Sequence, residues 1–557
     1  MKICAQNNIT FQRRLKPSEE AGYSHVLNSA KSKGKSVLII PATSLPNKTG
    51  VGNIGTKESL EFFDFAKKYW GINEVQILPM GQYHKHNEYY PFYSGTSMDL
   101  GSHVINIKDY ISQEDYNKIV KSSPHQTHVN FDCLKTEEKA LRKIFEEGKF
   151  KSEFEKFKFE NSERLEPKAL YRVLHEINGT HEYKNWNDID KNLYELPPDK
   201  RAKRIEEIKK LKGKEIDFYY FKQFLAEDSL KRAKEELNKR GLKLNGDMIC
   251  GFSYDEVWAN QKAFHKDTTI GWELPALNFD TPEGEKLLRE KVKFYAQKYG
   301  GIRVDAAETY INQPQIKDGI INKKYYGEKI LDIIEEEVKK VKGADFDYKS
   351  IMLENTHSKN HIGIYTSDYL SSGWGSSKSF LKLGWNPDSF IIGAKNHDSP
   401  VSLMTREQKK ALSEIYGEIK NEKEFMKLKL AEPMSAKHNM IYFMDALNIE
   451  GQFQNNINAN ENYAKLVPLD YQEKYFSALE NGKGFNPMDA LERNFKVQGL
   501  DKKEPKLFKQ IIKYRKILEQ KEKQTHSALK WCIGIICSGL MLYGLVKHYK
   551  NHTSDSI

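Results

Sequence analysis

Short apolar runs alternate with helical patterns along most of the chain, beginning at residue 36. Residues 36–40 and 74–78 are apolar runs of strand length, and residues 60–69 between them carry apolar side chains at helical spacing. A strand, a helix and a second strand in close succession are typical of a parallel sheet. We therefore expect the folded part of the chain to open with a β-α-β unit.

The same alternation returns after a long charged stretch. Residues 109–214 are charged and helical with few β-branched runs, which predicts a helical subdomain inserted into the sheet. After it we expect further helices and strands in this order: helix 216–240, strand 242–245, helix 282–299, strand 302–305, helix 325–342, strand 350–353 and strand 389–392. Repeated units of this kind predict an α/β fold with a (β/α)₈ barrel over residues 36–500, whose chemistry lies at the carboxyl-terminal face.

Three acidic residues each follow an apolar run and open a polar loop, namely Asp305, Glu354 and Asp398. On a parallel barrel such positions converge on one rim despite their separation in the sequence. Two carboxylates that face one bond are what glycosidic chemistry requires, because one attacks the anomeric carbon and the other protonates the leaving oxygen. The sequence therefore predicts a carboxylate site on the barrel rim.

Two neighbouring residues support this interpretation. Arg303 stands two positions before Asp305, so both side chains leave the same face of a strand, and the arginine can hold the carboxylate ionised and aimed. His397, next to Asp398, can hydrogen-bond a sugar hydroxyl. The alternatives are a structural ion pair at a strand end and a structural histidine.

Residues 89–94 are dense in aromatic side chains and follow an expected strand. Tyr90 and Phe92 in this loop can stack on sugar rings. Packing of the same rings on the barrel rim is the alternative.

Composition narrows the class of protein. The 557 residues carry a net charge of +11, of which nearly half comes from residues 501–523, where nine Lys or Arg face four acids. The sequence contains no zinc-ligand spacing, phosphate-loop pattern or RNA-stacking motif, so we expect no nucleic-acid partner. Five widely spaced cysteines argue against a disulfide framework and fit a reducing compartment, which places the catalytic domain in the cytoplasm.

The two ends of the chain differ from the middle. Residues 1–35 are polar without an apolar signal core, which predicts a disordered leader. Residues 501–527 predict a basic amphipathic helix and linker, which can lie on an anionic membrane or dock on the barrel. Residues 531–546 lack charge, so we interpret 528–550 as a C-terminal transmembrane helix that would tether the protein, with a buried terminal helix as the alternative.

Several motifs resemble those of one family. Residues 41–46 read Pro-Ala-Thr-Ser-Leu-Pro and are followed at 50–55 by Gly-Val-Gly-Asn-Ile-Gly. Residues 165–186 resemble the helical insert of that family, and Gly246-Asp247 with Glu-Val-Trp-Ala-Asn at 256–260 resemble its first barrel motif. Between about residues 36 and 448, the chain resembles the 4-α-glucanotransferases (amylomaltases), which share a barrel with the α-amylases.

The resemblance implies roles for particular residues. Asp305 falls on the family nucleophile, Glu354 on the general acid/base and Asp398 on the transition-state stabiliser. The substrate-binding positions are then Arg303, His397, Tyr90, Phe92 and Trp258. The implied reaction is a retaining double displacement that passes a segment of an α-1,4-glucan from Asp305 to another glucan, and it needs no metal or organic cofactor.

The chain also departs from the family pattern. Ala306-Ala307-Glu308 follows the nucleophile position, a form closer to the α-amylases, and Ser253 stands where a substrate-binding aspartate is expected, with Asp255 as a substitute after a shift. An α-amylase-like hydrolase is therefore one alternative. A catalytically inactive glucan-binding protein is the other.

Overall fold

A computed structural model describes residues 15–31, 33–81, 97–122, 127–366, 377–398, 405–449 and 465–520. The chain divides into two units, Met1–Leu518 and Glu519–Ile557, and the architecture below is that of the first.

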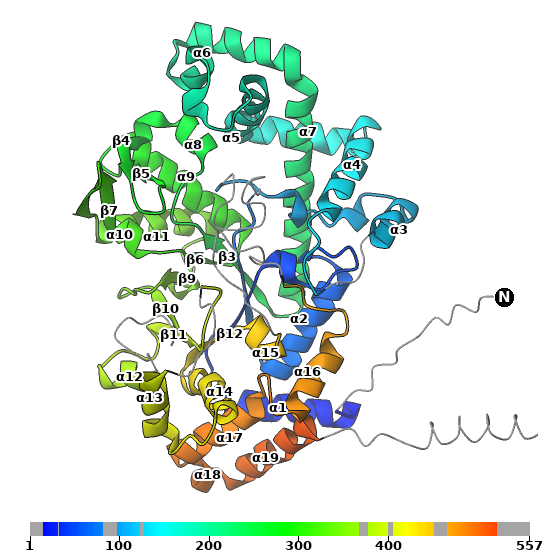
Figure 1. Cartoon of the computed structure of the whole chain (residues 1–557), viewed down its shortest axis with the longest axis vertical. Helices are drawn as coiled ribbons and strands as arrows, with labels where there is room; N and C mark the ends of the chain where they lie inside the picture. The colour runs from blue at the N-terminus through cyan, green and yellow to red at the C-terminus, as the bar shows by residue number, and fades with distance from the viewer. Residues whose placement is uncertain are drawn as a thin grey trace, which may run out of the picture. The chain divides into compact units, whose positions relative to one another are not determined.

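Eight parallel strands close into a barrel, in the order β1-β12-β11-β10-β9-β6-β3-β2 (Figure 1). Their bounds are β1 Ser36–Ile40, β2 Glu74–Ile77, β3 Lys243–Met248, β6 Gly301–Val304, β9 Ile351–Glu354, β10 Ile362–Thr366, β11 Phe390–Gly393 and β12 His438–Tyr442. Most of these strands are buried along their whole length, as expected for a sheet covered on both faces. The predicted barrel is confirmed.

Helices follow or precede the strands as the alternating pattern predicted. The expected helices at 60–69, 282–299 and 325–342 are α2 Lys57–Trp70, α9 Pro282–Lys298 and α11 Glu328–Lys342. Later helices complete this part of the chain: α12 Ser377–Lys382, α13 Arg406–Tyr416, α14 Glu422–Ala431, α15 Phe443–Leu447 and α16 Tyr471–Glu480.

A group of helices stands between β2 and β3 in the sequence. Their bounds are α3 Gln113–Ser122, α4 Cys133–Glu146, α5 Lys151–Asn178, α6 Asp188–Lys191 and α7 Pro198–Lys239. The predicted boundary at residue 214 falls inside α7, which has 42 residues and one non-helical position at Lys212. One helix thus begins among the helices of the insert and ends by leading the chain into β3.

A second, four-stranded antiparallel sheet was not predicted. It has the order β5-β4-β7-β8 and is built from β4 Phe264–Thr269, β5 Pro275–Leu277, β7 Asn312–Lys317 and β8 Ile320–Tyr325. Two short helices, α8 Tyr254–Ala259 and α10 Glu308–Ile311, connect it to the barrel strands. All six residues of β8 are exposed, so no alternation of apolar and polar positions marked it in the sequence.

The prediction of a disordered leader over 1–35 is wrong for part of that range. Residues Pro17–Ala30 form helix α1, which buries Tyr23, Val26 and Leu27. Three apolar residues on one helical face are enough to dock a short amphipathic helix, although the range as a whole is polar.

The basic stretch after residue 500 docks on the rest of the first unit. Here α17 Pro487–Gln498 and α18 Leu500–Lys503 precede α19 Pro505–Glu519. The ring of Tyr514 packs edge-on against Tyr23 at 5.6 Å, and Arg515 pairs with Glu492 at 2.6 Å. Two partners were predicted for this helix, an anionic membrane and the barrel domain. The contacts with Tyr23 and Glu492 show that α19 docks on the domain that contains the barrel.

Within the described ranges, none of the helices combines the length and apolar composition needed to cross a bilayer. The predicted transmembrane helix at 528–550 lies outside the described residues.

Candidate active site

Asp305 and Glu354 stand side by side at the carboxyl-terminal end of the barrel. The strands β6 and β9 are paired in parallel with Val304 opposite Leu353, so the next residue on each strand is one of the two acids. Asp305 leaves the strand at a turn where its N–H donates to the carbonyl of Met248, at the end of β3. The structure thus brings together two acids that are far apart in the sequence.

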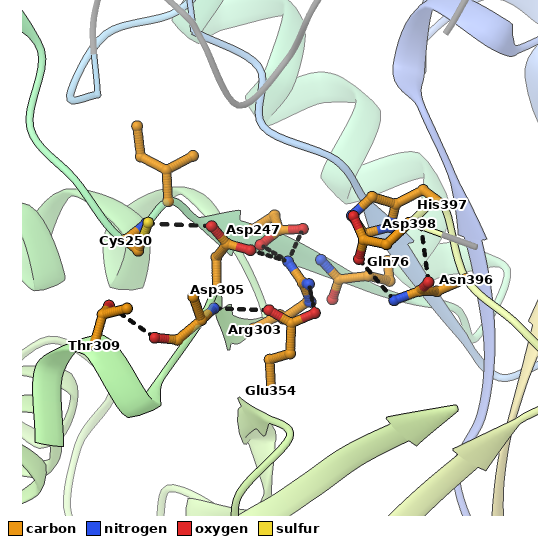
Figure 2. A network of polar contacts seen from close by, with 12 residues as sticks. Gln76, Asp247, Cys250, Arg303, Asp305, Thr309, Glu354, Asn396, His397 and Asp398 are labelled. Carbon is orange, nitrogen blue, oxygen red and sulfur yellow. Dashed lines mark hydrogen bonds and ion pairs between the residues drawn. The ribbon is translucent and has the colours of Figure 1, made fainter. Parts of the chain in front are cut away.

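A single guanidinium joins these acids (Figure 2). Arg303 donates from Nη1 to Oδ1 of Asp305 at 3.1 Å and from Nη2 to Oε1 of Glu354 at 2.5 Å. Its Nη1 also donates to both carboxylate oxygens of Asp247, at 2.6 and 2.7 Å. Arg303 is 1% exposed. A buried arginine that spans three carboxylates fixes their orientation, because the guanidinium is planar and rigid.

From the sequence, Asp247 was recognised only as part of a motif and was not predicted to be a site residue. It lies opposite Arg303 in the β3–β6 register, so its contact follows from strand pairing. The strand order of the barrel would have been needed to find it, because β3 and β6 are separated by more than fifty residues of other structure.

Backbone N–H groups also point at the two acids. Ala306 donates to Oε2 of Glu354 at 2.7 Å, and Cys250 donates to Oδ2 of Asp305 at 3.4 Å. Ala306 has φ +41°, a left-handed conformation that costs a non-glycine residue about 1 kcal/mol or more. The turn after Asp305 is therefore strained in the conformation that aims the Ala306 N–H at Glu354.

Asp398 and His397 follow β11 and reach the same region (Figure 2). The amide of Asn396 donates to Oδ2 of Asp398 at 2.9 Å, and Oδ1 of Asn396 accepts from the Asp398 N–H at 2.9 Å. His397 Nε2 lies 3.4 Å from Oδ1 of Asp398. Burial and the nearby Arg303 cation lower the pKa of His397 well below its usual range, so its imidazole is neutral at physiological pH.

The carboxyl groups interact through space. Burial raises the pKa of Asp305 well above its usual value, against the attraction of Arg303, and it raises the pKa of Asp247 to about 7. Negative charge on Glu354 and Asp398 adds to both shifts. Several carboxyls that share one guanidinium titrate together, and such a cluster retains protons at a pH where isolated carboxyls have lost them.

A buried lysine supports the loop beside Asp305. Lys291, on α9, is fully buried and donates from Nζ to the carbonyls of Ile249, at 2.7 Å, and Gly251. These carbonyls flank Cys250, whose N–H faces Asp305. Burial lowers the pKa of Lys291 to about 8. Its position inside an ordinary amphipathic helix pattern gave no signal in the sequence.

Trp258 does not reach this site. The side chain is fully buried, its indole N–H donates to the carbonyl of Asp190 at 2.9 Å, and its ring centroid lies 5.0 Å from that of Tyr194. The interpretation of Trp258 as a substrate-binding residue is therefore not supported by its position. The sequence alone does not show whether a tryptophan in a barrel motif faces the active site or packs against the helical insert.

Asp255 is also engaged elsewhere. It lies 3.3 Å from the ammonium of Lys168, and Ser253 is the residue that precedes α8. The predicted substitution of Asp255 for a substrate-binding aspartate is not supported, because both groups of this ion pair are buried. Tyr90 and Phe92 lie outside the described residues.

The described part of the chain contains no group of three or more His, Cys, Asp or Glu side chains arranged to hold a metal ion. The carboxylates at the rim are instead bonded to Arg303 and to backbone N–H groups.

Comparison with known proteins relates part of the chain to one family. The family model described as 4-alpha-glucanotransferase matches residues 40–281. Over this stretch, which is less than half of its 557 residues, the chain is similar to the 4-α-glucanotransferases. It is 26% identical over 238 residues to the 4-alpha-glucanotransferase of Clostridium butyricum, covering 40% of this chain and 45% of the relative. It is 28% identical over 244 residues to that of Thermus thermophilus, covering 41% and 45%.

Two solved amylomaltases share the fold of this chain. The amylomaltase from Streptococcus agalactiae in complex with acarbose aligns with a TM-score of 0.65 at 17% identity, over 84% of this chain and 99% of the other. The amylomaltase from Corynebacterium glutamicum aligns with a TM-score of 0.56 at 13% identity, over 90% and 76%.

The sequence match has a clear limit. The aligned stretch spans less than half the length of the curated relatives. Asp305, Glu354 and Asp398 all lie beyond residue 281, where the family match ends. Their assignment therefore depends on the geometry of the rim and on the quoted resemblance.

Proposed function

We propose that the protein is a retaining 4-α-glucanotransferase that moves segments of α-1,4-glucans between maltodextrin- or glycogen-type chains. The observation that carries this proposal is the bridge that Arg303 makes between Asp305 and Glu354. A guanidinium is only a few ångström wide, so the two carboxyls it joins are compatible with the separation of roughly 5–5.5 Å used by retaining glycosidases.

In the proposed reaction, the Asp305 carboxylate attacks the anomeric carbon while Glu354 gives its proton to the leaving glycosidic oxygen. The bond to the leaving chain breaks and a covalent glycosyl ester forms on Asp305. Glu354, now ionised, removes the proton from the 4-hydroxyl of an acceptor glucan, which attacks the anomeric carbon and releases Asp305.

This division of labour requires two carboxyls in different protonation states. The acid step needs one protonated carboxyl and the nucleophilic step needs one ionised carboxylate. Burial raises the pKa of Asp305, and in the proposal the Arg303 cation opposes that shift and keeps the nucleophile ionised. In the proposal, Asp398 stabilises the positive charge that develops on the sugar, and neutral His397 hydrogen-bonds a sugar hydroxyl.

Incubation of the pure protein with maltotriose tests the proposal. We expect a ladder of longer oligosaccharides together with glucose, because the glycosyl unit on Asp305 passes to a second sugar. Maltose and glucose without longer products would indicate a hydrolase of the α-amylase type. Unchanged maltotriose would contradict the enzymatic proposal and favour a glucan-binding protein.

The Asp305→Asn variant tests the nucleophile. We expect turnover to fall by roughly 10³-fold or more, because the amide cannot form the glycosyl ester. Asp318→Asn, an exposed change in the turn between β7 and β8, is the matched control and should keep full activity. Near-normal turnover of Asp305→Asn with an unchanged circular dichroism spectrum would reject the assignment.

A further inference from the structure

A cavity of about 860 Å³ lies at the opposite end of the barrel from Asp305. Its wall includes Lys35, which precedes β1, Asn73, which precedes β2, and His438, the first residue of β12. Residues of α1 and α2 complete much of the wall. The strands start here and reach the acidic rim at their other ends, so this cavity is separate from the candidate active site.

Lysines dominate the wall of this cavity. Six of them line it: Lys31, Lys33, Lys35, Lys67, Lys68 and Lys349. Among the described wall residues, the acids are Asp64 and Asp347. Lysines therefore outnumber acids in this wall.

Three of the six lysines lie at ion-pair distance from acids, among them Lys349 at 3.7 Å from Asp388. Lys35 pairs with Glu74 at 2.7 Å and Lys68 pairs with Glu20 at 2.5 Å. Lys31 donates to the carbonyl of Gly71 at 2.7 Å, and Lys67 donates to the carbonyl of Arg240. Within the described ranges, neither Lys31 nor Lys67 has a carboxylate at ion-pair distance, so neither amine is paired with an acid.

The two wall carboxylates are bonded to other groups. Asp64 lies 3.3 Å from the guanidinium of Arg240. Asp347 accepts the N–H of Lys349 at 3.0 Å and the hydroxyl of Ser350 at 3.4 Å, which caps a short helical turn. These two acids are thus engaged with groups other than the amines of Lys31 and Lys67.

Burial lowers the pKa of two amines near this cavity. Burial lowers the pKa of Lys31 to about 7. Burial and the neighbouring Lys35 cation lower the pKa of Lys243, which starts β3. An amine in such surroundings is stabilised when an anion arrives, because the anion offsets both the desolvation and the repulsion.

We propose that this cavity binds a small, multiply charged phosphate compound, such as a phosphate ester or a polyphosphate. Lysine ammonium groups bind phosphate oxygens as point charges, and Lys31 and Lys67 meet here with carbonyl oxygens as their partners instead of acids. The volume is in the range of small-molecule sites. A neutral glucan would leave this charge unmatched, so the ligand class differs from that of the candidate active site.

Calorimetric titration of the full chain with inorganic pyrophosphate, at constant ionic strength, tests the proposal. We expect one saturable site per chain. The double variant Lys31→Gln/Lys67→Gln should weaken binding at least about tenfold, or about 1.4 kcal/mol, since two amines that can bind phosphate oxygens are lost. Lys31→Arg/Lys67→Arg should retain most of the affinity because it keeps both charges.

A matched control separates this site from general basicity. Lys139→Gln/Lys151→Gln removes the same charge from exposed positions on α4 and α5 and should leave the affinity unchanged. Three outcomes would overturn the proposal: no saturable binding of pyrophosphate, equal weakening in both double Gln variants, or binding to anionic vesicles or DNA without binding of pyrophosphate.

Chemical protection gives a second readout that does not depend on a substitution. An amine with a pKa of about 7 is largely unprotonated near pH 7.5, so Lys31 should react with acetic anhydride ahead of ordinary exposed lysines. Saturating pyrophosphate should slow acetylation of Lys31, measured by peptide mass spectrometry, and leave Lys139 unaffected. Acetylation of Lys31 at the same rate with and without pyrophosphate would contradict the proposal.

Discussion

Two buried cations in this molecule each hold a cluster of carboxylates, and the clusters differ in what they can do. Arg303 bonds Asp247, Asp305 and Glu354 at the barrel rim. Lys168, on α5, lies 2.7 Å from Glu256 and 3.3 Å from Asp255, both on α8. In composition the two arrangements look alike.

Exposure separates them. The side chains of Asp305 and Glu354 are 14% and 10% exposed, whereas those of Asp255 and Glu256 are 2% and 3% exposed. A substrate can reach the first pair and cannot reach the second. The Lys168 cluster therefore fastens the helical insert to the barrel, while the Arg303 cluster presents acids to a ligand.

Hydrogen bonding separates Glu256 from Asp305 as well. Glu256 accepts from Lys168, from the hydroxyl of Ser97 and from the N–H of Ser253 at 3.0 Å. Burial acts to raise its pKa, but Lys168 and the Ser97 hydroxyl outweigh burial and lower the pKa to about 2. Burial instead raises the pKa of Asp305, and it also raises that of Asp255 to about 6. The contrast in pKa therefore holds between Glu256 and Asp305, whereas exposure is what separates the two clusters as wholes.

The largest effect is expected from Arg303→Met. The change leaves three carboxyls around a buried apolar side chain, so we expect glucan transfer to fall by roughly 10³-fold or more. Arg303→Lys keeps the charge and loses the fork, and should recover only part of the activity. Product analysis with maltotriose measures both. Equal activity in wild type and Arg303→Met would remove the bridge from the proposed mechanism.

Lys168→Met should act on stability rather than on chemistry. Removal of one partner from a buried ion pair costs about 3–5 kcal/mol, here by leaving Asp255 and Glu256 without their cation. The urea midpoint should fall, and the protein that remains folded should keep its activity. Lys209→Met removes an exposed partner of Glu166 and should cost at most about 1 kcal/mol. A midpoint equal to that of the control would show that the buried pair is dispensable.

Glu256→Gln should cost less, about 1–3 kcal/mol at neutral pH, because the neutral amide keeps some hydrogen bonds. The folded-state pKa of Glu256 is lowered to about 2, so its ionised form stabilises the fold above its unfolded pKa near 4.5. That contribution is lost as the pH falls from about 4.5 toward 2. Urea midpoints of variant and wild type should therefore converge over this range. A constant difference at every pH would be the contrary result.

The smallest effect is a shift in pH dependence. Negative charge on Asp247 contributes to the raised pKa of Asp305. Asp247→Asn removes that charge, so the pKa of Asp305 should fall and the acidic limb of the kcat/KM profile should move to lower pH. The displacement should be about one pH unit or less, which corresponds to about 1.4 kcal/mol. Movement of the limb to higher pH would contradict the electrostatic assignment.

The barrel strands that sequence patterns predicted were those with dense apolar runs. Strand β1 reads Ser-Val-Leu-Ile-Ile and was predicted at its observed bounds. By contrast, β12 opens with His438 and Asn439, and β10 carries Gly363 within five residues, so neither stood out. Strand β8 is exposed throughout and gave no burial pattern. The periodicity of apolar residues reveals which positions are buried. These strands are defined by their pairing with neighbouring strands, which that periodicity does not show.

The candidate site was predictable as far as it depends on strand ends. Asp305 and Glu354 were placed correctly on one rim because both end apolar runs. The contact between Arg303 and Asp247 depends on which strands are neighbours in the barrel. The local sequence of a strand does not reveal its neighbours. Trp258 was interpreted as a substrate-binding residue although its side chain is fully buried. The sequence alone does not distinguish an aromatic residue that lines a site from one that packs in the core.

Helix α7 carries a practical consequence for anyone who wishes to shorten this protein. Its first part belongs to the insert and its second part runs directly into β3, with the break in regular geometry at Lys212. Excision of the insert at a loop would also remove the second part of α7, which leads into β3. A shortened protein would have to be joined near Lys212, with a new helix start for the remaining half of α7.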